Sequence, residues 1–492
     1  MRVSEVVTIE EIESWNIGDV VTIEAGTGSG KSYFIKNNLY AIAKRDKKRI
    51  LMLIHRTNCV NQFQMEIEKD NKTDVIDIMT YQSIEYKMKN KQEFNFDQYD
   101  IICADEMHYF FSDASYNKYT DLSLEAILKQ TNKIRIFMSA TSGNMQKYIN
   151  KHKKVKTIDY KLPIDFSFIQ SLEFYANDET LDRYAKEAIE LNRKTIFFIQ
   201  SAKKAYEFYE KYKDFALFNC SKNNADGYYQ HVNAEKINNM LKNERFEESI
   251  LITTTVMDAG VNIIDDELSH IVADVSDTGT LIQCIGRKRL KNKEDKITLR
   301  IKVISGQSLG GRESQTRKKV EMAAYFTQNG QDKYIEKYYR ELDQSHIIYD
   351  ELTDSGYEKR RNDLMFFKAI IDVNEIEAIK GNREQAYCKY IASIFHIKKY
   401  SILEDIQAKD ELKTYLERVI GRKLFKNEQK ELVEKICLKD SRGRLQKGIS
   451  LLNEYFKLNK MNYLIVSKRT NELKDGKNIK VGYWEVLDNI IN

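Results

Sequence analysis

The 492-residue chain contains little proline, tryptophan or cysteine, and it has no long apolar run. Its single proline is Pro163, and its six cysteines are isolated, with no C-x-x-C pair. This spacing argues against a zinc site and a disulfide framework, and it fits a reducing compartment. No stretch of about 18 apolar residues occurs, and acidic residues stand near the N-terminus where a secretory signal would need an apolar core. We therefore expect a cytoplasmic protein with no membrane partner.

The composition is that of a globular protein with several domains. Hydrophobic residues make up 42% and charged residues 31% of the chain, and the length suggests about three domains. The formal net charge of +5 says little about partners. Four basic clusters stand out, each more typical of a solvated face than of a binding site: 147–156, 312–319, 421–426 and 439–447.

Apolar runs alternate with helical patterns from the N-terminus to about residue 305. This alternation predicts parallel sheets with helices on both faces. A polar break at 143–156 divides the pattern, so we expect two α/β domains, 1–160 and 161–305. The predicted strands are Val20–Glu24, Arg49–His55, Asp74–Thr80, Tyr99–Asp105 and Ile134–Ser139 in the first domain, and Thr195–Gln200, Phe215–Cys220, Ser249–Thr255, His270–Val275 and Lys296–Ser305 in the second.

Beyond residue 310 the sequence is charged, dotted with aromatic residues and spaced like helices. We assign 306–425 to a helical accessory region. Its tyrosines at helical spacing are expected to lie in the core rather than to form a stacking surface. These are Tyr334, Tyr338 and Tyr339.

The last segment, 426–492, combines helical patterns with a β-hairpin. Two strands, Tyr463–Ser467 and Ile479–Val486, flank the turn signal Asp475-Gly476. This arrangement looks like a winged-helix domain, in which one helix enters a nucleic-acid groove. The alternative is a helical cap with a stabilising hairpin and no nucleic-acid contact. In the first interpretation Tyr483 and Trp484 pack or stack, and the cations are Arg442, Arg444, Lys447, Lys468 and Arg469.

A glycine-rich loop follows the first predicted strand and precedes a helix-like segment, Tyr33–Lys44. Glycines let backbone amides turn toward an anion, and the helix N-terminus adds its positive end. In such a phosphate loop Lys31 reaches the β- and γ-phosphates and the Ser32 hydroxyl binds Mg²⁺. The first glycine of the pattern is Ala25 here, and a chance glycine-rich turn is the alternative. The residues expected to hold ATP are Ala25, Gly26, Thr27, Gly28, Ser29, Gly30, Lys31 and Ser32.

An acidic pair, Asp105 and Glu106, ends the fourth predicted strand and is followed by Met107 and His108. The carboxyl ends of parallel strands meet at one edge of a sheet, which places both carboxylates beside the phosphate loop. Asp105 would hold Mg²⁺, and Glu106 would orient and deprotonate the water that attacks the γ-phosphate. The spacing therefore favours a nucleotide-hydrolysing enzyme. For His108 the alternative is an ordinary surface histidine.

Two hydroxyl side chains, Ser139 and Thr141, end the next predicted strand. They could hydrogen-bond the carboxylates or the neighbouring domain. Taken alone, the segment is an ordinary strand-end cap.

In this order, the phosphate loop, the acidic segment and Ser139-Ala140-Thr141 resemble the first motor domain of a superfamily 2 DExH/DEAD-like helicase. Residues 253–262 resemble the fifth motif of that family, and residues 283–289 resemble the sixth. The resemblance implies two tandem RecA-like domains with ATP in the cleft between them, and coupling roles for His108, Ser139 and Thr141. Arg287 is the best candidate for an arginine finger. The residues implied on the second wall of the cleft are Asp258, Gly260, Gln283, Arg287 and Arg289.

The sequence departs from the family pattern at several points, and one of them is the absence of the prolines that are common in the first two motifs of relatives. The second arginine of the sixth motif stands one residue early, at Arg289, with Leu290 in its usual place. Which of Arg287 and Arg289 touches phosphate therefore stays open. Asn262 stands where many relatives carry aspartate, and we find no upstream glutamine that would select adenine.

Several polar side chains at strand ends correspond in position to nucleic-acid contacts of the family. Such side chains and nearby helix N-termini suit phosphate contacts, which position a strand without selecting its sequence. For each of them an ordinary strand-end cap is an equal alternative. They are Arg56, Gln62, Thr80, Gln82, Gln200, Ser201 and Thr254.

We therefore expect an ATP- and Mg²⁺-dependent motor that translocates on nucleic acid and unwinds duplex, with DNA favoured over RNA as its partner. One alternative is a translocase that moves on duplex or strips proteins without unwinding. Another is a DNA-binding initiator or defence subunit with an auxiliary ATPase. Asn292–Asp295 matches the guanine-binding N-K-x-D pattern of GTPases, but it lies in a charged stretch and not after an apolar strand, so we reject a GTPase.

Overall fold

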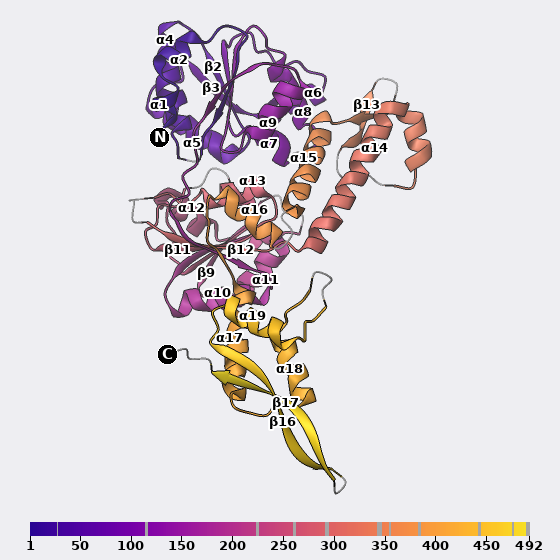
Figure 1. Ribbon diagram of the computed structural model, residues 1–492. Helices are drawn as coiled ribbons and strands as arrows, with labels where there is room; N and C mark the ends of the chain where they lie inside the picture. The colour runs from indigo at the N-terminus through magenta and orange to yellow at the C-terminus, as the bar shows by residue number, and fades with distance from the viewer. Residues whose placement is uncertain are drawn as a thin grey trace. The chain divides into compact units, whose positions relative to one another are not determined.

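The computed structural model divides the chain into two compact units, Met1–Tyr400 and Ser401–Asn492 (Figure 1). Within the described part, no helix is both long and apolar enough to cross a lipid bilayer. The structure describes residues 1–26, 28–113, 117–222, 226–258, 262–290, 295–341, 347–353, 356–381, 385–440, 444–474 and 477–488.

The first sheet has six parallel strands in the order β3-β2-β4-β5-β1-β6. β5 (Ile134–Ser139) lies between β1 (Val20–Glu24) and β4 (Ile101–Ala104). The segments that follow these three strands therefore emerge at the same edge of the sheet. The other strands are β2 (Ile50–Ile54), β3 (Ile76–Thr80) and β6 (Thr157–Lys161).

Helices cover both faces of this sheet, because side chains of a strand alternate between its faces. In β2, Leu51 and Leu53 pack into one buried cluster, whereas Ile50 and Met52 pack into the other. The cluster that contains Ile50 and Met52 also includes residues of α1 (Val3–Val6), α2 (Ile9–Ser14), the π-helical turn Phe34–Leu39, α4 (Tyr40–Arg45) and α5 (Thr57–Lys69). The cluster that contains Leu51 and Leu53 also includes residues of α6 (Tyr81–Lys89), α7 (Tyr109–Ser112), α8 (Thr120–Leu128), α9 (Gly143–Lys147) and the π-helical turn Tyr148–His152.

The second sheet repeats this design and confirms the prediction of two α/β domains with parallel sheets. Within the first unit its strands run in the order β7-β12-β11-β8-β10-β9. They are β7 (Ile169–Tyr175), β8 (Lys194–Ile199), β9 (Ala216–Asn219), β10 (Ile250–Thr253), β11 (Leu268–Asp274) and β12 (Ile297–Lys302). The accompanying helices are α10 (Glu179–Glu190), α11 (Ala202–Tyr212), α12 (Ala234–Asn243) and α13 (Thr278–Ile285).

Two strands of these sheets are absent from the sequence-based prediction. β6 is an edge strand whose residues are only partly buried, and it alternates polar with apolar residues. The side chain of Asp159 is bonded to Thr22 Oγ1 of β1 (2.6 Å). β7 pairs with β12 and contains polar residues at Gln170 and Glu173. Neither segment has the apolar run that marks a buried strand.

The accessory region is helical, as expected, but it also contains a hairpin that the sequence analysis did not predict. α14 (Gly306–Tyr338) bends at Gly330, whose φ is +81°. The hairpin strands are β13 (Ile348–Thr353) and β14 (Gly356–Arg361), and α15 (Asp363–Lys380) and α16 (Ala386–Ile394) follow. Tyr334 is buried and Tyr338 is partly buried, whereas Tyr339 is exposed, so its predicted place in the core is wrong.

Helix α15 contacts both α/β domains. Phe367 stacks on Phe111 of the first domain (ring centroids 6.3 Å apart), and the Asn362 side chain donates to the carbonyl oxygen of Lys118 (3.1 Å). Farther along, Glu375 accepts a hydrogen bond from the Thr278 hydroxyl of the second domain (2.7 Å). The accessory region is thus joined to both walls of the cleft described below.

The C-terminal unit has a hydrophobic core of its own. It begins at Ser401, ahead of the expected boundary at 426, because α17 (Leu403–Val419) contributes Leu412 and Leu416 to that core. Tyr483 is buried and Trp484 packs on the core; Arg442 and the turn Asp475-Gly476 lie outside the described residues. The other elements are β15 (Ser401–Ile402), α18 (Lys426–Ile436), α19 (Ile449–Leu458) and the antiparallel pair β16 (Tyr463–Lys474) and β17 (Lys477–Asp488).

Candidate active site

The phosphate loop connects β1 to the short helix α3 (Lys31–Tyr33). Gly28 and Gly30 have φ angles of +82° and +86°, a conformation that only glycine adopts at little cost. The Ser29 hydroxyl donates to the carbonyl oxygen of Gly26 (2.7 Å) and closes the turn. A Cβ atom at Gly28 would lie 2.7 Å from a guanidinium nitrogen of Arg289, so a side chain of the second domain also restricts this position.

Lys31 is only 8% exposed. Its ammonium group donates to the carbonyl oxygens of Ala25 (2.9 Å) and Gly26 (3.4 Å) and so lies across the loop. An ammonium group has three donors, and this one lines the same cleft as Ser32. The loop therefore presents a buried cation and a hydroxyl, a donor set that suits a phosphate group and its metal ion.

The acidic pair Asp105 and Glu106 lies directly after β4, and both residues line the cleft. Burial and the neighbouring Glu106 raise the pKa of Asp105 to about 6. Burial alone would also raise the pKa of Glu106, but the cations Lys31 and Arg287, with His108, hold it well below its ordinary value. Glu106 adopts a φ of +51°, a strained conformation for a residue with a side chain, and its backbone N–H donates to Asp105 Oδ1 (2.9 Å).

A small polar network joins the acidic pair to the end of β5. Nδ1 of His108 lies 3.3 Å from Glu106 Oε2 and 3.1 Å from Ser139 Oγ. Ser139 Oγ also accepts a hydrogen bond from the backbone N–H of Thr141 (3.2 Å). Among the described residues, none donates a hydrogen bond to Oε2 of Glu106. This carboxylate oxygen is thus ionised, buried and able to accept a bond from a water molecule.

The second wall of the cleft comes from the residues after α13. Arg287 is buried and its Nε donates to the carbonyl oxygen of Gln283 (3.2 Å). Arg289 Nε donates to Asn262 Oδ1 (2.8 Å), and burial together with Arg287 lowers the pKa of Arg289 to about 10. Nε2 of Gln283 lies 3.5 Å from Thr141 Oγ1, so this second-domain glutamine reaches the first-domain network.

These residues enclose a cleft of about 350 Å³ between the two α/β domains. It brings together most of the residues predicted for nucleotide binding and hydrolysis. Thr27 and Gly260 lie outside the described residues, and so does the side chain of Asp258. From the first domain the cleft is lined by Gly28, Gly30, Lys31, Ser32, Asp105 and Glu106, and from the second by Asn262, Arg287 and Arg289.

One face of α5 also lines the cleft. Its members Cys59, Gln62, Phe63 and Glu66 stand at the spacing of adjacent helical turns. Gln62 therefore lines the nucleotide cleft, and its expected contact with nucleic acid stays a prediction. No sequence motif marks Cys59, Phe63 and Glu66 as site residues. Their helical spacing after a strand end was nevertheless a signal that one helix face could line a site. Burial raises the pKa of the Cys59 thiol to about 11, which favours the neutral thiol.

The other predicted nucleic-acid contacts lie at strand ends and make local hydrogen bonds. Thr80 and Ser201 accept bonds from the backbones of Ser83 and Lys204 and so cap α6 and α11. These bonds are the ordinary capping contacts named as the alternative. Of the remaining residues, Gln82 donates to the carbonyl oxygen of His55, Gln200 accepts from Ser276, Thr254 accepts from the N–H of Val256, and Arg56 precedes α5.

The two parallel-sheet domains and this cleft agree with the resemblance to superfamily 2 helicases that the motifs indicate, and a match to a family model lies in the first domain. Residues 7–144 match the model of the family described as "Type III restriction enzyme, res subunit". No curated protein sequence matches the chain.

Three solved structures illustrate the similarity of fold. A variant of S. cerevisiae Dbp5 bound to RNA and ADP BeF3 is 16% identical, with 59% of this chain and 81% of that chain covered and a TM-score of 0.44. The DEAD-box helicase Mss116 bound to ssRNA and UDP-BeF is 15% identical, with coverage of 79% and 84% and a TM-score of 0.44. A DEAD box protein from the hyperthermophile Methanococcus jannaschii is 16% identical, with coverage of 64% and 88% and a TM-score of 0.34.

Replacing Gly28 by alanine is expected to weaken nucleotide binding about tenfold. The positive φ costs a side chain roughly 1–2 kcal/mol, and the new methyl group must displace the Arg289 guanidinium. Titration with a fluorescent ADP analogue measures the loss. Gly310→Ala is the matched control, because no described atom lies within 4 Å of its added Cβ. Equal affinities for the two variants would contradict the loop geometry.

Proposed function

We propose that this chain couples ATP hydrolysis in the interdomain cleft to movement along nucleic acid, and that it unwinds duplex. The observation that carries the proposal is the partly buried carboxylate pair Asp105 and Glu106, which shares one cleft with Lys31 of the same domain and with Arg287 and Arg289 of the other. A cleft of this kind changes its electrostatic balance when a charged phosphate group enters or leaves it.

Each group on the first wall has a distinct task in the proposed hydrolysis. Lys31 binds the β- and γ-phosphates, and its present bonds to loop carbonyls hold the ammonium group in place. Ser32 and Asp105 would hold Mg²⁺, which when bound neutralises charge on the phosphates. Glu106 accepts a hydrogen bond from the attacking water through Oε2, and the nearby cations keep that oxygen ionised.

The two arginines of the second wall are proposed to divide the remaining work. Arg289 lies against Gly28 and is therefore placed to bind phosphate in the ground state. Arg287 acts electrostatically on Glu106, where the attacking water would lie, and is proposed as the arginine finger. The network of Gln283, Thr141, Ser139 and His108 then provides a route from the acidic pair to the second domain.

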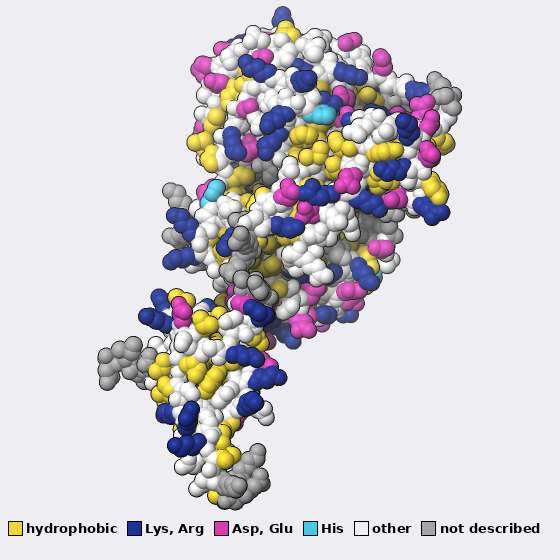
Figure 2. Space-filling view, turned by 45° about the vertical axis from the view of Figure 1, so that its right-hand side comes forward, with side chains coloured by type: hydrophobic (Ala, Val, Ile, Leu, Met, Phe, Trp, Pro, Cys, Tyr) yellow, Lys and Arg dark blue, Asp and Glu magenta, His cyan; other side chains and the backbone are white. Residues whose placement is uncertain are grey.

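The C-terminal unit supports a nucleic-acid partner through its charge. Residues 401–492 contain 19 Lys and Arg and 14 Asp and Glu, so their excess of five positive charges equals the net +5 of the whole chain. In Figure 2 this unit, the lower part of the view, shows dark-blue Lys and Arg side chains spread over its visible surface. A net positive charge of this kind favours phosphate backbones, and we propose DNA as the partner.

The same charge excess favours a second candidate function, in which recognition of nucleic acid by the C-terminal unit is the main task and the ATPase is auxiliary. A translocase that does not separate strands is the nearer alternative. All three candidate functions use the same residues of the ATP cleft. Assays with different nucleic-acid substrates therefore distinguish between these functions, whereas variants of the cleft do not.

Lys31→Ala and Glu106→Gln are expected to abolish turnover for different reasons. Loss of Lys31 removes charged hydrogen bonds to phosphate and weakens ATP binding about tenfold or more. Glu106→Gln leaves binding intact and lowers kcat on the order of 10²-fold or more, because the water loses its acceptor. Steady-state ATPase and nucleotide-binding assays separate the two effects. Wild-type turnover in both variants would refute the site.

Arg287→Ala is expected to lower kcat on the order of 10³-fold with little change in KM, since its charge acts on the transition state. Arg289→Ala is expected to raise KM for ATP more than it lowers kcat, because Arg289 lies at the loop that grips phosphate. Full ATPase kinetics measure both parameters. Arg245→Ala, in which an exposed arginine of the second domain is removed, serves as the control. The reverse pattern would assign the finger to Arg289.

Nucleic acid is expected to stimulate the ATPase, and stimulation should weaken as salt rises because counterions are released on binding. The assay uses single-stranded and duplex forms of DNA and RNA. Strand separation on a forked duplex supports unwinding, whereas triplex displacement without unwinding favours a duplex translocase. An ATPase rate that no nucleic acid changes, beside tight DNA binding by the Glu106→Gln variant, favours the recognition function.

A further inference from the structure

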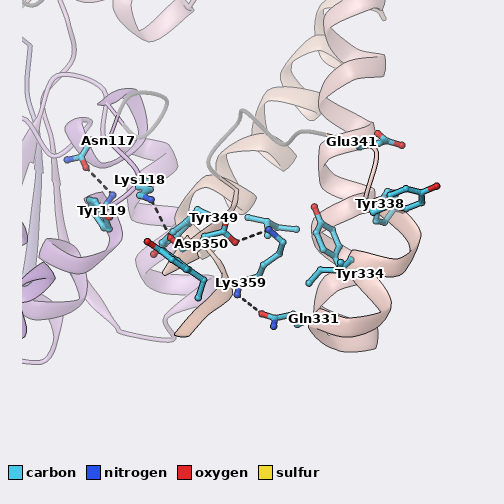
Figure 3. A pocket seen from close by; sticks show the side chains of 14 residues that line it. Asn117, Lys118, Tyr119, Gln331, Tyr334, Tyr338, Glu341, Tyr349, Asp350 and Lys359 are labelled. Atoms are coloured by element: carbon cyan, nitrogen blue, oxygen red, sulfur yellow. Dashed lines mark hydrogen bonds and ion pairs between the residues drawn. The ribbon is translucent and has the colours of Figure 1, made fainter. Parts of the chain in front are cut away.

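A cavity of about 780 Å³ lies where the first domain meets the accessory region (Figure 3). One wall is formed by residues 117–119, and the others by α14 and the β13–β14 hairpin. None of the residues described as lining it lines the nucleotide cleft. The function proposed above therefore leaves this cavity without a role.

Tyrosine rings dominate the lining of this cavity. Tyr119 comes from the first domain, Tyr334 and Tyr338 project from α14, and Tyr349 lies on β13 (Figure 3). Tyr339 and Tyr357 also line the cavity and are 67% and 74% exposed. These two exposed rings beside the cavity offer faces on which a planar group can stack. This surface, made of the six tyrosines named here, is called the tyrosine surface below.

Cations stand beside these rings. Nζ of Lys118 lies 5.2 Å from the ring centroids of both Tyr119 and Tyr349. On α14 and just beyond it, Lys337 and Arg340 lie 5.1 Å and 5.2 Å from the rings of Tyr338 and Tyr339. Aromatic rings interleaved with cations are the signature of single-strand binding, in which bases stack and phosphates pair with the cations.

We propose that the tyrosine surface binds an unpaired nucleic-acid segment by stacking its bases on Tyr339, Tyr357 and Tyr338. Lys118, Lys337 and Arg340 contact the phosphates. This inference rests on the proposed function, because it gives the motor a second contact with the strand, outside the cleft. The ligand class is single-stranded nucleic acid, whether DNA or RNA. The cations beside the rings favour it over a proline-rich peptide, which also docks on aromatic grooves but carries no phosphates.

The test uses the full chain, without nucleotide, and short oligonucleotides that carry one 2-aminopurine, one in oligothymidine and one in oligouridine. Binding of the wild type is expected to quench 2-aminopurine fluorescence through stacking. The double variant Tyr339→Ala with Tyr357→Ala is expected to bind about tenfold or more weakly and to lose the quench, because each stacked base contributes roughly 1–3 kcal/mol. Comparison of the oligothymidine and oligouridine probes shows whether the surface prefers DNA or RNA.

The double phenylalanine variant at the same two positions keeps the rings and should keep the affinity and the quench. Tyr86→Ala removes a tyrosine of α6 that is 68% exposed outside this cavity, and it should bind like the wild type. ATPase without nucleic acid should be the same in every variant, because none of these residues lines the nucleotide cleft.

The outcomes separate this inference from the proposed function. Alanine variants that bind and quench like the wild type overturn the site, even where nucleic acid stimulates the ATPase. Binding of a proline-rich peptide that depends on these tyrosines, with oligonucleotide binding unchanged, assigns the surface to a protein partner and also overturns it. Loss of quenching only in the alanine variant supports the site, even where the wild type shows no stimulated ATPase.

Discussion

Two neighbouring carboxylates lie partly buried at the end of β4, and the cations around them offset the energetic cost. Like charges in a low dielectric repel strongly, and each loses hydration. Lys31 from the first domain and Arg287 from the second, with His108, lower the pKa of Glu106, whereas burial and the charge of Glu106 raise the pKa of Asp105. Side chains of both α/β domains therefore set the balance of charge around this pair of carboxylates. A change of charge in the cleft alters the interaction between the two domains, and on this physical basis we propose that hydrolysis is linked to movement.

The accessory region is built into this arrangement. α15 packs on α7 of the first domain through Phe367 and Phe111, and it bonds α13 of the second domain through Glu375 and Thr278. α13 also carries Gln283, which reaches Thr141 in the first domain. A shift of one domain against the other must therefore be accommodated by α15. The hairpin that precedes α15 forms part of the tyrosine surface, so the proposed second strand contact is covalently continuous with the element that bridges the cleft.

Much of the fold was predictable because the buried parallel strands are short apolar runs that end in functional residues. β1, β4 and β5 each end at the segment expected from the sequence, and their shared edge follows from the topology of parallel sheets. The strands that were not predicted from the sequence are those without such an apolar run. β6 is a partly buried edge strand, β7 contains polar residues, and β13 and β14 form an isolated two-stranded hairpin with many charged side chains. Tyr339 was assigned to the core from helical spacing, but it follows the end of α14 and faces solvent.

Local residue order was enough to identify the phosphate loop, the acidic pair and the order of the motifs, because it fixes which groups follow which strand. It could not determine which arginine meets which part of the cleft, that one face of α5 lines it, or that six tyrosines from distant segments share a cavity. Those facts depend on how the second domain and the accessory region pack against the first. Side-chain packing between segments far apart in the chain sets the 2.7 Å approach of Arg289 to the Cβ position of Gly28, and no local pattern encodes it.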